Sequence, residues 1–358
     1  MRIIFFISSS DRPIGGNKVI YRYVQELNKQ SISAFVMHTI KNFKCTWLDE
    51  EPSIINPKYF QPEDHIIFTE MGISRYYNFI IRHNLQFSIF VQNGYHLSTG
   101  VFDGDTREKV KKLYNKASYV FSISEDTSDS INTFLSIPKE KIIRMQYYRK
   151  ISVFDKNKTK SNLITYMPRK NYEHAHKVLF GLMNQLPKDW RIKPIINMTD
   201  KQLRDTMDES KIFLAFSSFE GLPAPPIEAA FAKNFVVGYH GQGGLEYWEE
   251  PVFSVVEPFN VKSFISKILK KISYLEECST FPFEDFNKFC DSFQHLFSKE
   301  GEINCLKKMS EKISVLAKGK DMKKIPNKLQ KNKYTLEIEN RFIGLERRLK
   351  NKARFLEK

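Results

Sequence analysis

Short apolar segments recur along the first 150 residues and are separated by longer stretches with helical periodicity. The stretch 17–30 places apolar residues one, three and four positions apart, which predicts a helix. Segments that are apolar throughout and alternate with helices indicate a parallel sheet buried on both faces. The expected strands are RIIFFI (2–7), SAFVMH (33–38), HIIFTE (65–70), FSIFV (87–91) and SYVFSIS (118–124).

A second alternating set follows the polar, Lys-rich stretch 145–162, which we interpret as a linker. Its expected elements are strand 162–167, helix 174–186, strand 193–198, helix 200–209, strand 212–216, a helix from Pro226, strand 235–239 and strand 252–256. We therefore expect an α/β protein with two doubly wound Rossmann-like domains, at 1–150 and 151–320. The cleft between two such domains is the default ligand site.

The end of the chain has a different character. Residues 322–335 are basic, and the segment after them carries apolar residues at heptad-like spacing. We expect a basic amphipathic helical tail over 321–358. Two interpretations stay open: the helix packs on the body or pairs with a second copy in a homodimer, or it lies on an anionic membrane surface.

Composition narrows the classes of function. The chain is 41% hydrophobic, typical of a folded protein, and no apolar run reaches the roughly 18 residues of a membrane-spanning helix. Of the net charge of +15, residues 306–358 carry +11, from 17 Lys and Arg against 6 Asp and Glu. A near-neutral body with a basic tail disfavours a nucleic-acid groove through the fold and suits an anionic membrane.

Four cysteines without metal-ligand spacing are expected to be reduced thiols of a cytoplasmic protein. With the basic tail, this predicts a cytoplasmic chain that attaches peripherally to the inner face of the membrane.

Two glutamates stand on either side of three prolines in FEGLPAPPIEAAFAKNFVVGYHGQGGLEYW (219–248). Glu220 falls in the loop after a predicted strand, and Glu228 is expected in the first turn of the next helix. Free N–H groups at such a turn attract phosphate, while carboxylates accept hydrogen bonds from ribose and sugar hydroxyls. The pattern predicts a sugar nucleotide lying across this turn. The alternative is an ordinary helix start with two solvated acids.

This segment resembles the E-x7-E signature of retaining glycosyltransferases with the GT-B fold, in the glycosyltransferase-4-like group. In that group a Val-Val strand and a Gly-Gly-x-x-Glu turn follow, as FVVGY and GGLE do here. The resemblance implies that Glu220 contacts the donor sugar and Glu228 the nucleotide ribose. It also implies that backbone groups near the phosphates or sugar come from Gly243, Gly244 and Leu245.

The stretch YMPRKNYEHAHKVL (166–179) is similar to the family's strand end that grips the diphosphate. The resemblance makes Arg169 and Lys170 the diphosphate ligands and, with Glu220, the catalytic residues. Arg can chelate phosphate through two N–H groups, and Lys acts as a point charge. In the family these two residues are several positions apart, whereas here they are adjacent. A surface basic pair at a strand end is the alternative.

Two loops of the first domain complete the resemblance. Gly15 and Gly16 stand where the family has a glycine-rich turn facing the donor. In VQNGYHLSTG (91–100), relatives carry a histidine that touches the donor sugar. Gln92, Asn93 and His96 are therefore expected to contact the sugar or the acceptor.

The function implied is retaining transfer of a sugar from a nucleotide-diphosphate sugar to a saccharide or lipid-linked acceptor, in cell-surface polysaccharide or glycolipid synthesis. No cofactor, metal or nucleic acid is expected; DGD (103–105) has Asp-x-Asp spacing but lies in an expected loop. Two alternatives stay open. One is a nucleotide-sugar epimerase of the same architecture, and the other is a non-catalytic subunit that binds a partner through the C-terminal helix.

Overall fold

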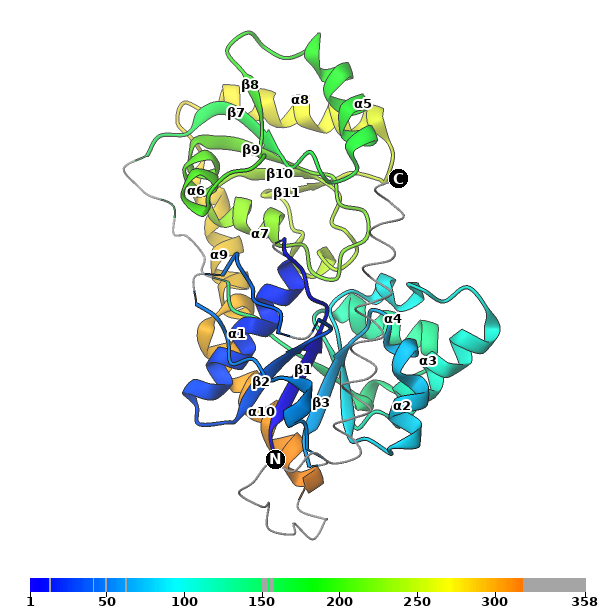
Figure 1. The fold of residues 1–358 in the computed structure, drawn as a ribbon. Coiled ribbons are helices and arrows are strands. Elements are labelled where there is room, and N and C mark those ends of the chain that lie inside the picture. Colours follow the sequence, from blue (N-terminus) through cyan, green and yellow to red (C-terminus); the bar gives the residue numbers. More distant parts are fainter. Residues whose placement is uncertain are drawn as a thin grey trace.

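Two α/β units, each built on a parallel sheet, make up the molecule in a computed structural model of the chain (Figure 1). The structure describes residues 1–12, 14–40, 42–48, 50–61, 63–149, 154 and 158–317. The tail at 321–358, with its predicted helix, dimer and membrane contacts, lies outside the described residues.

The first sheet has six parallel strands in the order β2-β1-β3-β4-β5-β6. Five of them follow the expected apolar segments, whereas β6 has three half-buried residues and too short a pattern to be recognised. The strands are β1 (Ile3–Ile7), β2 (Ala34–His38), β3 (His65–Thr69), β4 (Phe87–Val91), β5 (Val120–Ser122) and β6 (Ile142–Arg144). The helices are α1 (Gly15–Lys29), α2 (Tyr77–Arg82), α3 (Gly104–Lys116) and α4 (Glu125–Leu135).

Strand β1 shows why this sheet is covered on both faces. Successive side chains of a strand point to opposite faces, and every residue of β1 is buried. Ile3 and Phe5 belong to the same apolar cluster as α1, whereas Ile4 and Phe6 join the cluster that contains the buried residues of α2, α3 and α4. An uninterrupted apolar run is therefore the sequence signature of this position in the fold.

The second sheet has five parallel strands in the order β11-β10-β9-β7-β8. Its strands are β7 (Ser161–Tyr166), β8 (Arg191–Pro194), β9 (Ser210–Ala215), β10 (Phe235–Gly238) and β11 (Phe253–Val255). Its helices are α5 (Tyr172–Met183), α6 (Asp200–Glu209), α7 (Ala224–Phe231), α8 (Val261–Glu277) and α9 (Asn287–Phe293). Two doubly wound parallel domains, the fold class expected from the sequence, are confirmed.

One strand is shifted from its expected position. The strand predicted at 193–198 is β8, which begins at Arg191 and ends at Pro194. It lies at the edge of the sheet and is mostly exposed. The prediction followed the apolar pair Ile195–Ile196, but the faces of β8 are mostly exposed and therefore carry no apolar run.

Helix α10 (Lys299–Ala317) follows the second sheet in the chain but packs against α1 of the first domain. Its Glu302 is fully buried and accepts hydrogen bonds from Arg22 of α1, with Nη2 at 2.5 Å, and from the Tyr148 N–H at 2.8 Å. The range 151–320, assigned to the second domain from the sequence, therefore includes a helix that contacts the first.

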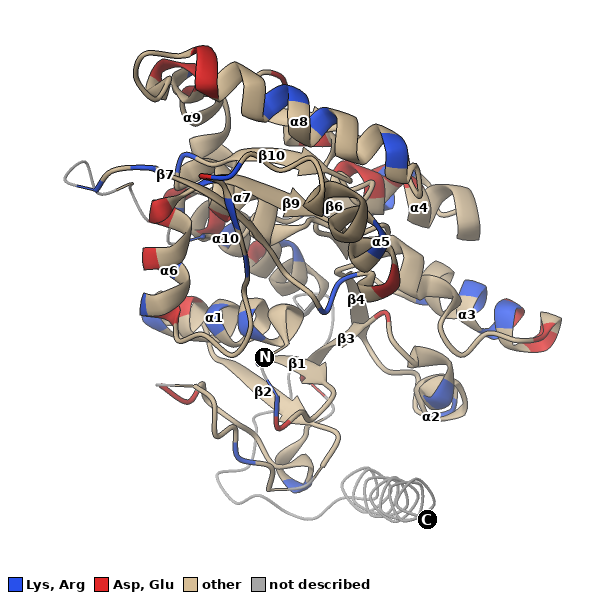
Figure 2. Cartoon of the chain, turned by 90° about the horizontal axis from the view of Figure 1, so that it is seen from above, with Lys and Arg blue, Asp and Glu red and all other residues tan. Residues whose placement is uncertain are grey.

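Charge is distributed over both domains. Figure 2 shows Lys and Arg interspersed with Asp and Glu on helices of both domains, as expected for a body of small net charge. Within the described residues, no helix is both long enough and apolar enough to cross a membrane.

We predict that Glu302→Gln lowers the free energy of unfolding by about 2 kcal/mol, because a buried carboxylate paired with Arg22 is replaced by a neutral amide. Urea unfolding of the full chain measures this effect. Glu300→Gln, at an exposed position of the same helix, is the matched control and should change stability by less than about 0.5 kcal/mol. Equal effects of the two variants would show that Glu302 does not anchor α10.

Candidate active site

The loops that follow β4 and β9 bring the carboxyl ends of the two sheets together. Asn93 Nδ2 donates a hydrogen bond to the Phe219 carbonyl at 3.2 Å. The Gln92 carbonyl oxygen lies so close to Gly221 that a Cβ on Gly221 would be 1.9 Å from it. Only glycine permits such a contact between two backbones. The predicted residues Gln92 and Asn93 thus lie against the loop that carries Glu220.

A second close approach stacks the turn after β10 on the same loop. A Cβ on Gly243 would lie 1.9 Å from the Gly221 carbonyl oxygen. The Glu220 N–H donates to the Gly241 carbonyl at 2.8 Å, and the Gly243 N–H donates to the Glu220 carbonyl at 3.2 Å. Close packing therefore explains the glycine at position 243.

The predicted backbone donors of this turn are already engaged. Besides the bond from Gly243, the Gly244 N–H donates to the His240 carbonyl at 2.9 Å, and the Leu245 N–H donates to the Gln242 carbonyl at 3.0 Å. A donor substrate could be bound through these three N–H groups only if they gave up those bonds.

Glu220 and Lys170 form an ion pair between the loop after β9 and the turn after β7. Both side chains remain partly exposed. Asn171 holds this turn in place, because its Nδ2 donates to the Phe216 carbonyl and to Ser218 Oγ, each at 2.6 Å. The structure thus brings two predicted catalytic residues into contact.

Arg169, the third predicted catalytic residue, is exposed in the same turn. Within the described part of the chain, it has no hydrogen-bond or ion-pair partner. Its guanidinium is therefore available to an anion from solution.

Glu228 does not lie where we expected it. Helix α7 begins at Ala224 and has prolines at its start, so Glu228 is its fifth residue and lies beyond the first turn. Its carboxylate is paired with Arg149 Nη1 at 2.5 Å. Arg149 in turn lies over the Tyr147 ring, with its Cζ 5.2 Å from the ring centroid. A ribose bound at Glu228 would share the carboxylate with Arg149.

The two predicted glycines of the first domain open α1. Gln92 Nε2 donates to the Gly16 carbonyl at 3.0 Å, and a Cβ on Gly16 would meet the Gln92 side chain. A Cβ on Gly15 would meet no atom within 4 Å. The start of α1 is thus joined to the same Gln92 that contacts the second domain.

His96 belongs to the short 3-10 segment Gly94–Ser98 of the first domain. Its Nδ1 lies 3.8 Å from Oε1 of Glu70, which directly follows β3. The Glu70 side chain is only 4% exposed, and its Oε2 is buried without a hydrogen-bond partner among the described residues. The contact with Glu70 raises the pKa of His96, and the Glu220 carboxylate adds to that effect.

Our sequence prediction missed Glu70, because this residue was treated only as the last position of an apolar strand. A usable signal was present. An acid at the carboxyl end of a buried parallel strand lies at the edge where ligands bind.

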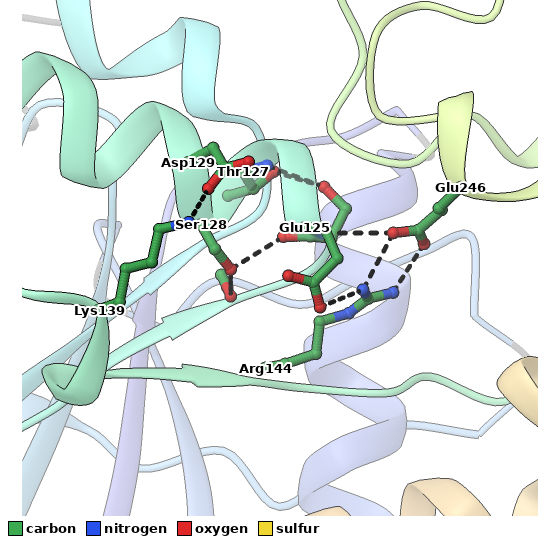
Figure 3. Close-up of polar contacts among 9 residues, drawn as sticks. Glu125, Thr127, Ser128, Asp129, Lys139, Arg144 and Glu246 are labelled. Atoms are coloured by element: carbon green, nitrogen blue, oxygen red, sulfur yellow. Dashed lines mark hydrogen bonds and ion pairs between the residues drawn. The ribbon is translucent and has the colours of Figure 1, made fainter.

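A third acid of the 219–248 segment joins the domains. Glu246 belongs to the 3-10 turn Leu245–Tyr247, and Arg144 is the last residue of β6. Arg144 Nη2 and Nη1 lie 2.6 and 2.9 Å from the two Glu246 carboxylate oxygens. Arg144 also pairs with Glu125 of α4 at 3.0 Å, and the Glu125 N–H donates to Glu246 at 3.2 Å (Figure 3). The bidentate contact between Arg144 and Glu246 joins the turn after β10 to the first domain.

Among the described residues, no group of three or more His, Cys, Asp and Glu side chains could hold a metal ion. Asp103 of the DGD sequence caps α3, because its Oδ1 accepts a hydrogen bond from the Thr106 N–H at 2.7 Å. The Asp-x-Asp spacing thus coincides with a helix start.

We predict a coupling free energy of about 1 kcal/mol between Arg144 and Glu246. A double-mutant cycle with Arg144→Met and Glu246→Gln, measured by urea unfolding, gives this quantity. The coupling should shrink at high ionic strength, because salt screens the two charges.

The exposed pair Lys139–Asp129 of the first domain (Figure 3) is the control cycle, with an expected coupling below about 0.5 kcal/mol. Equal coupling in the two cycles would contradict a specific role for the Arg144–Glu246 contact.

We also predict that Glu70→Gln lowers the pKa of His96, because the neighbouring negative charge that favours the imidazolium is removed. Since the pKa of His96 is raised on folding, its attraction to Glu70 is present at low pH and is lost as the pH rises through that pKa. Histidine NMR titration, with the signal assigned by His96→Gln, measures the change. An unchanged pKa would mean that Glu70 does not act on His96.

The chain is similar to known proteins in structure only. No protein-family model and no curated protein sequence matches the chain. Similar solved structures include the lipopolysaccharide outer core galactosyltransferase WaaB (14% identity, TM-score 0.60), which is matched over 88% of this chain and 100% of that one.

Two further similar structures are Anabaena HepE with UDP-glucose (14%, TM-score 0.65, over 88% and 100%) and S. aureus TarM with UDP and fondaparinux (11%, TM-score 0.64, over 87% and 100%). These neighbours are GT-B glycosyltransferases, and the chain has the GT-B fold.

Proposed function

We propose that the chain is a glycosyltransferase that moves a sugar from a nucleotide-diphosphate sugar to a saccharide or lipid-linked acceptor, with retention of configuration. The observation that carries this proposal is the Lys170–Glu220 ion pair at the carboxyl edge of the second sheet, in a loop that Gln92 and Asn93 of the first domain contact. Similar structures that contain UDP or UDP-glucose support a nucleotide sugar as the donor.

Lys170 and Arg169 would hold the leaving diphosphate. As the bond to the sugar breaks, negative charge grows on the diphosphate, and fixed cations stabilise it. Arg169 is exposed and unpaired among the described residues, so it can take two phosphate oxygens without breaking an existing contact. Lys170 would exchange its partner from the Glu220 carboxylate to a phosphate oxygen.

That exchange frees Glu220 for the sugar. Its carboxylate can then accept hydrogen bonds from sugar hydroxyls and stabilise the positive charge of an oxocarbenium-like transition state. Retention follows if the acceptor hydroxyl attacks from the side that the diphosphate leaves, with the departing phosphate accepting its proton. Two cations in place of a metal, together with the E-x7-E resemblance, support metal-independent retaining transfer.

His96 and Glu70 belong to the acceptor side of the proposed site. Glu70 orients the imidazole, and the exposed face of His96 can contact the donor sugar or the incoming hydroxyl. The basic composition of 321–358 supports peripheral attachment to an anionic membrane, where a polysaccharide or glycolipid acceptor would be found.

The first experiment is the melting temperature of the full chain with UDP, GDP, dTDP, CMP and ADP, with and without magnesium. A bound nucleotide stabilises the folded chain by RT ln(1 + [L]/Kd), about 2.7 kcal/mol at a hundredfold excess over Kd. A shift with one nucleoside diphosphate that needs no magnesium supports the proposal and identifies the nucleotide of the donor. No shift with any of them contradicts it.

We predict that Lys170→Gln reduces the nucleotide-dependent melting shift and lowers sugar transfer at least about 100-fold, because one cation at the diphosphate is lost. Glu220→Gln should lower transfer as much but keep the nucleotide shift, since its carboxylate serves the sugar. Radiolabelled sugar transfer and melting curves measure both effects.

Lys188→Gln, at an exposed position of the same domain, is the charge-matched control and should leave both readouts unchanged. If Lys170→Gln behaves like this control, Lys170 does not hold the diphosphate.

A further inference from the structure

A hollow of about 530 Å³ opens beside the turn that carries Lys170. It lies between the start of α5 and the loop that leads from β11 into α8. Its volume falls in the range of small-molecule sites. Its lining includes Asn171, Tyr172, Glu173, His174, Lys177 and Phe259.

Two aromatic side chains of this lining are exposed to water. Tyr172 is 66% exposed and Phe259 is 65% exposed. They come from different elements, α5 and the loop before α8, yet line the same hollow. A single exposed aromatic residue needs no explanation, but a pair that lines one hollow is typical of a binding surface.

Phe259 is held in position by a hydrogen-bonded network. Its backbone has φ +64°, a conformation that a residue with a bulky side chain rarely adopts. Its N–H donates to Tyr239 Oη at 3.0 Å, and this hydroxyl is hydrogen-bonded to Nε2 of His174. The Phe259 ring lies edge-on to the His174 ring, with 5.9 Å between centroids. A residue with a strained backbone thus carries a ring that is mostly exposed, and strained residues of this kind cluster at ligand sites.

Asn171 is a second residue with a left-handed backbone at this hollow, with φ +45°. It directly follows Lys170, and its side chain bonds to Phe216 and Ser218 in the loop that leads to Glu220. The hollow and the Lys170–Glu220 pair therefore share one turn of the chain. A ligand that occupies the hollow would lie next to the proposed site of sugar transfer.

The chemistry of the lining fits a sugar ring. A pyranose has a face of C–H groups, which packs on an aromatic ring, and a rim of hydroxyls that both donate and accept hydrogen bonds. The carboxylate of Glu173 can accept hydrogen bonds from these hydroxyls, and the ammonium group of Lys177 can donate hydrogen bonds to them. Burial lowers the pKa of His174, whose Nε2 is hydrogen-bonded to Tyr239 Oη.

We propose that this hollow binds a sugar unit of a saccharide acceptor, at a distance from the hydroxyl that receives the transferred sugar. The proposal rests on the proposed glycosyltransferase function and gives that function a second-domain subsite for the acceptor. The aromatic rings contact the C–H face of the sugar unit, and the charged residues bind its hydroxyls.

Saturation-transfer NMR with the full chain and a panel of maltotriose, cellotriose, chitotriose and galactotriose tests this subsite. Tyr172→Ala removes one ring. Phe259→Gly removes the other, and it keeps the backbone unstrained because glycine adopts a positive φ freely. Phe180→Ala is the matched control, since Phe180 is 72% exposed on α5 and does not line the hollow.

We expect at least one trisaccharide to bind the wild-type chain and the Phe180→Ala variant equally. Its Kd should rise at least about fivefold in each of the other two variants. UDP-dependent melting shifts, measured on the same samples, should be the same in all four proteins.

Two results would overturn the proposal: no trisaccharide signal from the wild-type chain, or unchanged saccharide binding in Tyr172→Ala and Phe259→Gly. A parallel loss of the UDP shift in those variants would assign the hollow to the nucleotide and would also overturn it. A different result is that no nucleotide shifts the melting temperature of the wild-type chain while trisaccharide binding depends on both rings. That result would contradict the use of a nucleotide sugar as donor but would support saccharide binding in the hollow.

Discussion

The position of the two domains relative to each other depends on close contact between three backbone segments. Gln92 of the first domain touches Gly221 of the second, and Gly221 touches Gly243, in both cases at a distance that no side chain permits. The carbonyl of Gln92 therefore meets the loop that carries Glu220. Any residue other than glycine at position 221 would push the loops apart. The site exists only while these segments remain in contact.

Ion pairs add to the contact that these backbone segments make. Each of the three acids in the 219–248 segment has a basic partner from outside that segment: Glu220 pairs with Lys170, Glu228 with Arg149 and Glu246 with Arg144. Arg144 comes from the first sheet and Arg149 from the start of the linker. Only the Lys170–Glu220 pair lies within the second domain. The pairs of Glu228 and Glu246 hold the segment against the rest of the molecule, so the proposed donor site and the domain contact use the same stretch of sequence.

The sequence predicts the fold well because buried parallel strands are apolar on both faces, as β1 and β4 are. It misses β6, which is short and half-buried, and it shifts β8, which is mostly exposed and has no apolar run. Lys170 and Glu220 were both predicted to bind the same ligand, but their direct contact was not predicted. The partners of Glu228 and Glu246 could not be predicted, because Arg149 and Arg144 are distant in sequence and no periodic pattern marks them. Glu70 was missed since an acid at a strand end gives no periodic signal.

In the proposed function, a nucleotide sugar binds between the carboxyl edges of the two sheets, against Lys170 and Glu220. Hydrogen exchange of the full chain tests this binding mode, measured with and without the nucleotide sugar whose base raises the melting temperature. We expect slower exchange in peptides that cover 167–172 and 217–229 and in the loop 92–98 of the first domain, with no change in α3. Protection confined to other segments, or none in 167–172 and 217–229 at saturating nucleotide sugar, would contradict it.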